Sequence, residues 1–119
     1  MKFLKSEHIE TILNSNHGGE GLFRLWDGIL DTFPSISFED CKEEFLDLVN
    51  YLTENKILRL VSSDELANRK EISEETKQKI LKDWLERVDW DYQNDASWKM
   101  YEFDFSFLQW LKSYPIKII

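Results

Sequence analysis

The segment SFEDCKEEFLDLVNYLTENKILRLV, residues 37–61, contains the longest predicted helix and a buried strand directly after it. Its apolar side chains recur at helical spacing and form one stripe, made of Phe38, Cys41, Phe45, Leu48, Val49 and Leu52. Ser37 is placed to cap the helix, and Asp40 stands where a capping box has its carboxylate. The helix should end near Asn55-Lys56, and residues 57–61 should form a strand. One helix face and one strand therefore form the expected centre of the fold.

The opposite side of this predicted helix is acidic. By helical spacing it carries Glu39, Asp40, Glu43, Glu44, Asp47 and Glu54. The whole chain has a net charge of -8, from 23 acids and 15 bases. Residues 39–47 contribute five acids and one base, and residues 86–104 contribute six acids and two bases, so these two segments hold the entire excess. Such a field repels nucleic acid and anionic membranes, and it favours basic partners.

Length and composition indicate one domain, residues 1–119, because the chain is too short for two separate cores. Only four glycines and two prolines interrupt it, which favours helices. A lone cysteine, Cys41, excludes an internal disulfide and suits a reducing compartment. The sequence shows neither a signal peptide nor an apolar run long enough to cross a membrane, so we expect a cytoplasmic protein.

The remaining elements follow from apolar spacing and from capping residues. We expect helices beginning at Ser6, over residues 21–33 and over residues 73–88, with residues 62–71 as a polar loop. Gly28 lies inside the second of these helices, which indicates a close helix crossing. The fold class we expect is α+β and mainly α, with about five helices and a two-stranded sheet.

The C-terminal part permits two interpretations. In the first, Asp104 caps a short helix that carries Phe107, Leu108, Trp110 and Leu111. In the second, the alternation of Phe103, Phe105 and Phe107 marks a strand. In either case residues 116–119, which are rich in isoleucine, read as a terminal strand paired with residues 57–61.

No arrangement of residues predicts catalysis. The glycines after His17 resemble an esterase oxyanion loop, but the G-x-S-x-G motif that such enzymes need is absent. His8 and His17 are the only histidines, and no metal-binding spacing is present. Cys41 lies on the apolar stripe, where a buried structural thiol is expected. Carboxylate pairs such as Asp89 with Asp91 are typical of a solvated acidic face. We therefore predict a protein that is not an enzyme and has no cofactor and no metal.

The strongest candidate for a functional site is the segment 89–104, DWDYQNDASWKMYEFD, which we interpret as an ordered surface loop. Aromatic anchors supply contact area and acids complement a basic partner, so the segment has the composition of a binding patch. The candidate partner-binding residues are Asp89, Asp91, Tyr92, Asp95, Trp98, Glu102 and Asp104. The alternative is that the aromatics belong to the core and the acids are solvent cover. A second candidate face is the acidic back of the helix in residues 37–54, which offers charges with little apolar area between them.

The order of helix, turn and strand in residues 37–61 also suggests a winged helix. A DNA-binding winged helix carries lysine and arginine on its exposed helix face, whereas this face carries carboxylates. A winged-helix-like transcriptional regulator, or another non-enzymatic protein-interaction module, is the alternative function.

Several motifs together resemble a family of short acidic bacterial proteins that includes CdiI-type immunity proteins of contact-dependent growth inhibition. The resemblance rests on GLFRLWDGIL at 21–30, ISFEDCK at 36–42, KILRL at 56–60, ISEE at 72–75 and PIKII at 115–119. These motifs cover most of the chain, but they are structural and carry no catalytic residue. Asn55-Lys56 stands where a glycine turn is usual. The resemblance implies a protein that binds and blocks the C-terminal domain of a cognate toxin, often a nuclease, without binding nucleic acid or membrane itself.

Overall fold

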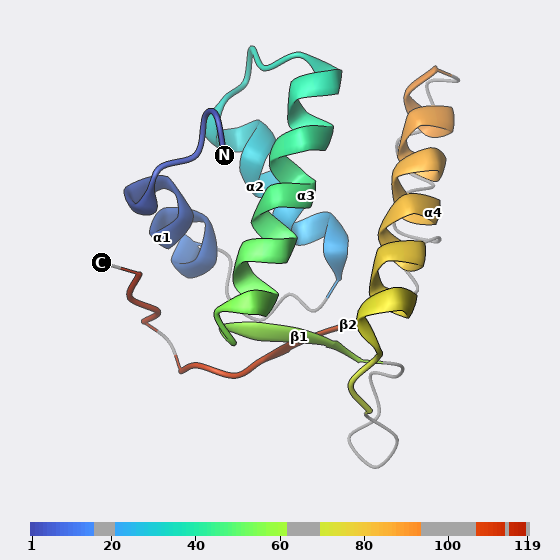
Figure 1. Cartoon of the computed structure of the whole chain (residues 1–119). Helices are drawn as coiled ribbons and strands as arrows, with labels where there is room; N and C mark the ends of the chain where they lie inside the picture. The colour runs from blue at the N-terminus through green and yellow to red at the C-terminus, as the bar shows by residue number, and fades with distance from the viewer. Residues whose placement is uncertain (16–20, 62–69, 94–106, 114, 119) are drawn as a thin grey trace.

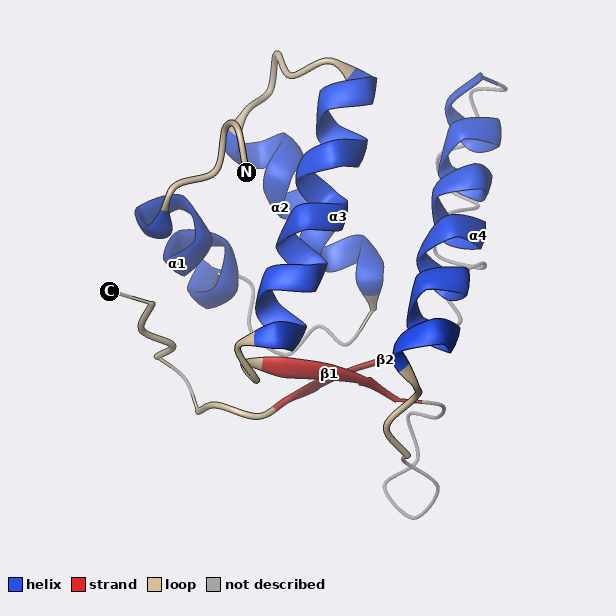
Figure 2. Cartoon of the chain, viewed as in Figure 1, coloured by secondary structure: helices blue, strands red, loops and turns tan. Residues whose placement is uncertain are grey.

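A computed structural model describes residues 1–15, 21–61, 70–93, 107–113 and 115–118. The elements in chain order are α1 (Ser6–Ser15), α2 (Leu22–Thr32), α3 (Phe38–Glu54), β1 (Leu58–Val61), α4 (Glu74–Gln93) and β2 (Phe107–Trp110). Figures 1 and 2 show α3 at the centre, with α2 behind it, α4 beside it and the small sheet at its end. The mainly helical α+β class and the two-stranded sheet are confirmed, with four helices in the described residues where about five were expected.

The start and the buried face of α3 agree with the prediction. The Oγ of Ser37 accepts a hydrogen bond from the backbone N–H of Asp40 at 3.1 Å, as an N-cap does. Five residues of the predicted stripe are buried, namely Cys41, Phe45, Leu48, Val49 and Leu52. The apolar periodicity of this segment was therefore sufficient to orient the helix.

α3 ends in a Schellman motif that turns the chain into β1. The N–H of Ile57 donates to the carbonyl of Leu52 at 2.9 Å, and the N–H of Lys56 donates to the carbonyl of Thr53 at 3.2 Å. Lys56 has a φ of 55°, in the left-handed region where glycine is the usual residue. A lysine thus occupies the position at which the sequence lacks the expected glycine.

The sheet decides between the two interpretations of the C-terminal part. β1 pairs antiparallel with β2, with Leu58 opposite Trp110 and Val61 opposite Phe107. The predicted helix over 107–111 is wrong, because residues 107–110 form β2, with Leu108 in the core and Leu111 46% exposed. The second interpretation, a strand, agrees with β2 at Phe107. The rest of that predicted strand, residues 103–106, lies outside the described residues.

The predicted terminal strand is also wrong, because residues 115–118 are not in a strand and the partner of β1 is β2. Ile116 is buried, and its backbone is held by a side chain of α1. The amide of Asn14 accepts from the N–H of Ile116 at 2.7 Å and donates to its carbonyl at 2.8 Å. Side-chain hydrogen bonds thus replace a sheet ladder for this segment, which lies beside α1 in Figure 1.

The predicted close crossing at Gly28 is confirmed. A Cβ built on Gly28 would lie 2.7 Å from Cγ2 of Ile12, closer than real Cβ contacts come. α1 and α2 therefore pack at a distance that only a glycine at this position permits.

Glu44 corrects the predicted acidic back of α3. Its side chain is 1% exposed, and its carboxylate accepts hydrogen bonds from three backbone N–H groups, those of Lys2 at 2.7 Å, Phe3 at 3.0 Å and Leu4 at 3.2 Å. The N-terminal segment covers this position, which helical spacing alone places at the edge of the acidic face. A buried carboxylate requires such donors, so Glu44 anchors the N-terminus.

No helix in the described ranges combines the length and the apolar character needed to cross a membrane.

Candidate partner-binding groove

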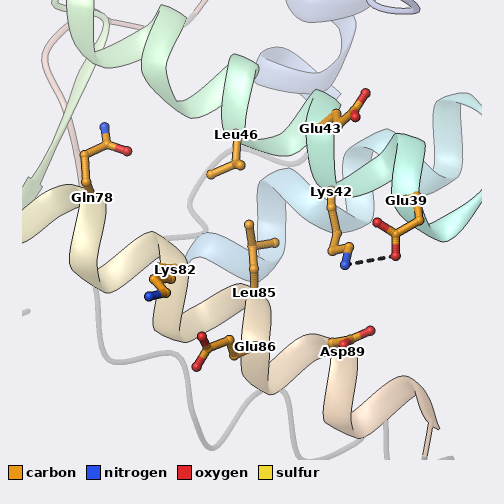
Figure 3. Close-up of a pocket in the computed structure, with 9 residues that line it drawn as sticks. All are labelled: Glu39, Lys42, Glu43, Leu46, Gln78, Lys82, Leu85, Glu86 and Asp89. Atoms are coloured by element: carbon orange, nitrogen blue, oxygen red, sulfur yellow. Dashed lines mark ion pairs between the residues drawn. The ribbon is translucent and has the colours of Figure 1, made fainter.

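A groove of about 380 Å³ lies between α3 and α4 (Figure 3). Two apolar side chains and seven polar or charged ones line it. They are Glu39, Lys42, Glu43 and Leu46 from α3, and Gln78, Lys82, Leu85, Glu86 and Asp89 from α4. In each helix every one of these residues has another three or four positions away, so each set forms one face.

Aromatic packing fixes α4 next to α3. The ring of Trp84 stacks on that of Phe45, with centroids 4.7 Å apart, and Trp26 of α2 packs edge-on against both rings at 5.8 Å. Leu81 and Val88 are buried on the same side of α4. The neighbouring face of α4, which carries Leu85 and the groove residues, is thereby turned toward α3.

A buried lysine attaches the first turns of α4. The Nζ of Lys77 donates to Oγ1 of Thr53 at 2.9 Å and pairs with Glu74 at 3.0 Å, although its side chain is only 6% exposed. Gln78 adds a hydrogen bond to Asn50 of α3 at 3.1 Å. These contacts cross between the two helices at the end of the groove nearest the sheet.

The floor of the groove is apolar. Leu46 and Leu85 point toward one another from the two helices in Figure 3, and both are partly buried against the core. Lys42 extends from α3 toward α4 beside them, with its Nζ 3.0 Å from Oε1 of Glu39. The same Nζ lies 5.2 Å from the centre of the Phe38 ring. Lys42 is therefore held in place by a carboxylate and an aromatic ring.

The groove is left with an excess of negative charge. It has four carboxylates against two ammonium groups, and Lys42 neutralises Glu39. Within the described ranges the carboxylates of Glu43, Glu86 and Asp89 make no ion pair and no hydrogen bond. The arrangement suits a ligand with positive charge and an apolar portion.

The loop predicted over residues 89–104 is wrong at its start, because α4 continues to Gln93. Asp89 lines the groove, and Asp91 and Tyr92 lie in the last turn of α4. Neither glycine nor proline occurs after Ile72 and before Pro115, so no helix breaker ends α4 at Val88. Four further predicted site residues lie outside the described residues, namely Asp95, Trp98, Glu102 and Asp104.

In the sequence, the acidic back of α3 and the segment from Asp89 are two alternative candidate faces. The structure places Glu39 and Glu43 of the first and Asp89 of the second around one groove. Glu54 lies at the far end of α3 and does not line it. The groove residues that were not predicted are Lys42, Leu46, Gln78, Lys82, Leu85 and Glu86. The helical spacing of 78, 82, 85, 86 and 89 is a signal that was present in the sequence.

The other candidate groups have structural roles in the described part of the chain. Cys41 is fully buried, and burial together with the nearby Glu44 carboxylate raises the pKa of its thiol to about 12. The Nδ1 of His8 accepts from the N–H of Lys5 at 3.0 Å, and its ring packs edge-on against Phe33. His17 lies outside the described residues. Among the described residues, no three His, Cys, Asp or Glu side chains gather to hold a metal ion.

No family model matches the chain, and neither the curated proteins nor the solved structures contain a match.

Proposed function

We propose that this protein is an immunity protein that binds and neutralises the toxin domain of a contact-dependent growth inhibition system. The observation that carries this proposal is the α3–α4 groove, where carboxylates from two helices surround an apolar floor. A surface of this composition suits a basic protein partner. The type of partner comes from the family resemblance described above.

The charge of the whole chain supports the same partner. At a net charge of -8 and a sequence pI of about 4.7, the protein attracts basic surfaces and speeds their association. Nucleases present basic surfaces to their nucleic acid substrates. An acidic protein that covers such a surface blocks substrate entry without any chemistry of its own.

Inhibition in this proposal is stoichiometric. One copy of the protein covers the substrate-binding surface of one toxin domain, with the groove at the centre of the interface. Charge sets the rate of association and its salt dependence, whereas buried contacts such as those of Leu46 and Leu85 set the rate of dissociation. Asp89, the member of the predicted partner-binding residues that lines the groove, belongs to the same proposed interface.

The decisive experiment begins with the neighbouring gene. The protein should be encoded directly downstream of a large toxin gene, and co-expression with the C-terminal domain of that toxin should restore growth. The two purified proteins should form a 1:1 complex by size-exclusion chromatography with light scattering. Growth arrest despite co-expression, or two separate peaks at micromolar concentration, would refute the proposal. A gel shift with duplex DNA at low salt tests the regulator alternative, and we expect no shift because the exposed face of α3 is acidic.

A further inference from the structure

We propose that the α3–α4 groove is a receptor for one arginine side chain of the protein partner. Leu46 and Leu85 contact the aliphatic stem of this arginine, and the carboxylates of Glu43, Glu86 and Asp89 surround its guanidinium. The inference rests on the proposed function, because it names the chemistry by which that partner enters the groove.

The groove has room for a long side chain. It measures about 380 Å³ and lies open to solvent between α3 and α4, so a side chain of a partner can enter it from the surface. Its lining spans two turns of α3 and three turns of α4, which matches an extended side chain lying between the helices.

The lining has the two kinds of surface that an arginine presents. The stem of an arginine is apolar and packs on apolar neighbours while its charged head remains at a polar surface. Leu46 and Leu85 face one another across the floor, and the charged residues stand around them in Figure 3. A purely apolar side chain would leave the carboxylates without a partner, and a small cation would leave the leucines uncovered.

The charge balance calls for one additional cation. Lys42 is neutralised by Glu39, so three carboxylates face the single ammonium of Lys82. Neither Glu43 nor Glu86 nor Asp89 has an ion-pair partner in the part of the chain that the structure describes. A positively charged side chain of the partner would therefore replace solvent around these three carboxylates, for which the described part of the protein supplies no cation.

Arginine fits better than lysine because the carboxylates project from two different helices. A guanidinium has five donors in a planar fork and bonds several carboxylates at once, whereas an ammonium is a compact and strongly hydrated charge. Arginine is also enriched among the residues that dominate binding energy at interfaces.

The test uses the full chain labelled with nitrogen-15 and a capped pentapeptide that contains one arginine between alanines and glycines. We expect this peptide to shift the amide resonances of residues 39–46 and 78–89, with a dissociation constant on the order of 1 mM. A peptide with citrulline, which has the same shape without charge, should cause no shift. A lysine peptide should bind about two- to fivefold more weakly.

Three variants make the test specific. Asp89→Asn should weaken binding of the arginine peptide about two- to fivefold, because it removes one unpaired carboxylate. Asp83→Asn is the matched control, since Asp83 is exposed on the same helix and does not line the groove. Lys42→Gln should strengthen binding by a similar factor, because it removes a competing cation and frees Glu39.

The inference is wrong if citrulline or spermidine perturbs the same resonances as arginine, or if Asp83→Asn and Asp89→Asn have equal effects. These results are separable from the proposed function. If the protein binds its toxin but the arginine peptide does not perturb the groove, the proposed function stands and the arginine-receptor inference is refuted. If the peptide binds in the groove but the protein does not bind the toxin encoded next to it, the inference stands and the proposed function is refuted.

Discussion

The indole of Trp84 on α4 stacks on the ring of Phe45 on α3, with 4.7 Å between the centroids and 15° between the planes. This pair is one of the contacts that place α4, and α4 supplies more than half of the groove residues. The groove therefore depends in part on an aromatic contact within the core.

Replacing Trp84 by alanine should lower the free energy of unfolding by about 3–5 kcal/mol, because it leaves a large cavity next to Phe45 and Trp26. Urea denaturation followed by circular dichroism measures this change. Trp90→Ala is the control, since Trp90 is 46% exposed and its loss should cost less than about 1 kcal/mol. Equal losses in the two variants would show that Trp84 does not hold α4.

Lys56→Gly should stabilise the protein by about 1 kcal/mol. Lys56 occupies the left-handed position of the Schellman motif with a φ of 55°, where a side chain is strained and glycine is not. Thermal unfolding should show a higher midpoint for this variant. Lys56→Ala retains the Cβ and should bring no comparable gain, so a similar rise in both variants would argue against backbone strain as the cause.

Glu44→Ala should destabilise the protein by about 3 kcal/mol or more, because three backbone N–H groups, one buried and two partly buried, lose their acceptor. Hydrogen exchange at Phe3 and Leu4 should accelerate along with the loss of stability. Glu43→Ala changes the adjacent exposed acid and should have an effect within about 0.5 kcal/mol. Unchanged exchange at the N-terminus would exclude the anchoring role.

Cys41 should resist thiol reagents in the native protein at pH 8 and react only on unfolding. Burial raises the pKa of its thiol to about 12 from the ordinary value of 9.0, so the reactive thiolate is absent from the folded state. The unfolded thiol ionises first as pH rises, which stabilises the unfolded state. The contribution of Cys41 to stability is therefore complete below pH 9 and is lost between about pH 9 and pH 12.

The pH dependence is measured as a difference between the natural protein and Cys41→Ala, because lysines and tyrosines titrate in the same range. The gap in unfolding free energy between the two should narrow above pH 9. Rapid labelling of native protein at pH 8 would contradict the burial of the thiol.

Charge reversal on both sides of the groove tests the proposed interface. Glu43→Lys with Asp89→Lys should weaken toxin binding and reduce its sensitivity to salt, because rim charges act on association. Glu75→Lys with Asp83→Lys makes the same change in net charge at exposed positions outside the groove lining. Surface plasmon resonance at two salt concentrations distinguishes the two pairs. If the control pair weakens binding as strongly, general charge and not the groove explains recognition.

The sequence predicts the structure of one of its two candidate binding segments better than that of the other. The acidic residues of α3 lie where periodicity places them, apart from Glu44, which the N-terminal segment covers. The segment after Val88 has no apolar period, which favours a loop, but it contains neither glycine nor proline, and α4 continues to Gln93. Apolar periodicity appears only where one face of a helix is buried, so the end of a helix that extends beyond the core shows no such periodicity.

Local chemistry was enough to define the cap at Ser37, the buried stripe of α3, the end of the helix at Asn55 and the close approach at Gly28. The cap, the stripe and the helix end depend on residues of one helix and its ends, so spacing and capping rules reach them. The close approach was signalled by a glycine inside a helical pattern, although the residue that it approaches, Ile12, lies on another helix. The pairing of β1 with β2 was beyond those rules, because its partners are about fifty residues apart and residues 116–119 have equal strand character. The groove was beyond them for the same reason. Its two walls come from helices that pack through the stacking of Trp84 on Phe45 and through side-chain hydrogen bonds such as that of Lys77 to Thr53. Contacts between such distant segments are decided by packing in three dimensions.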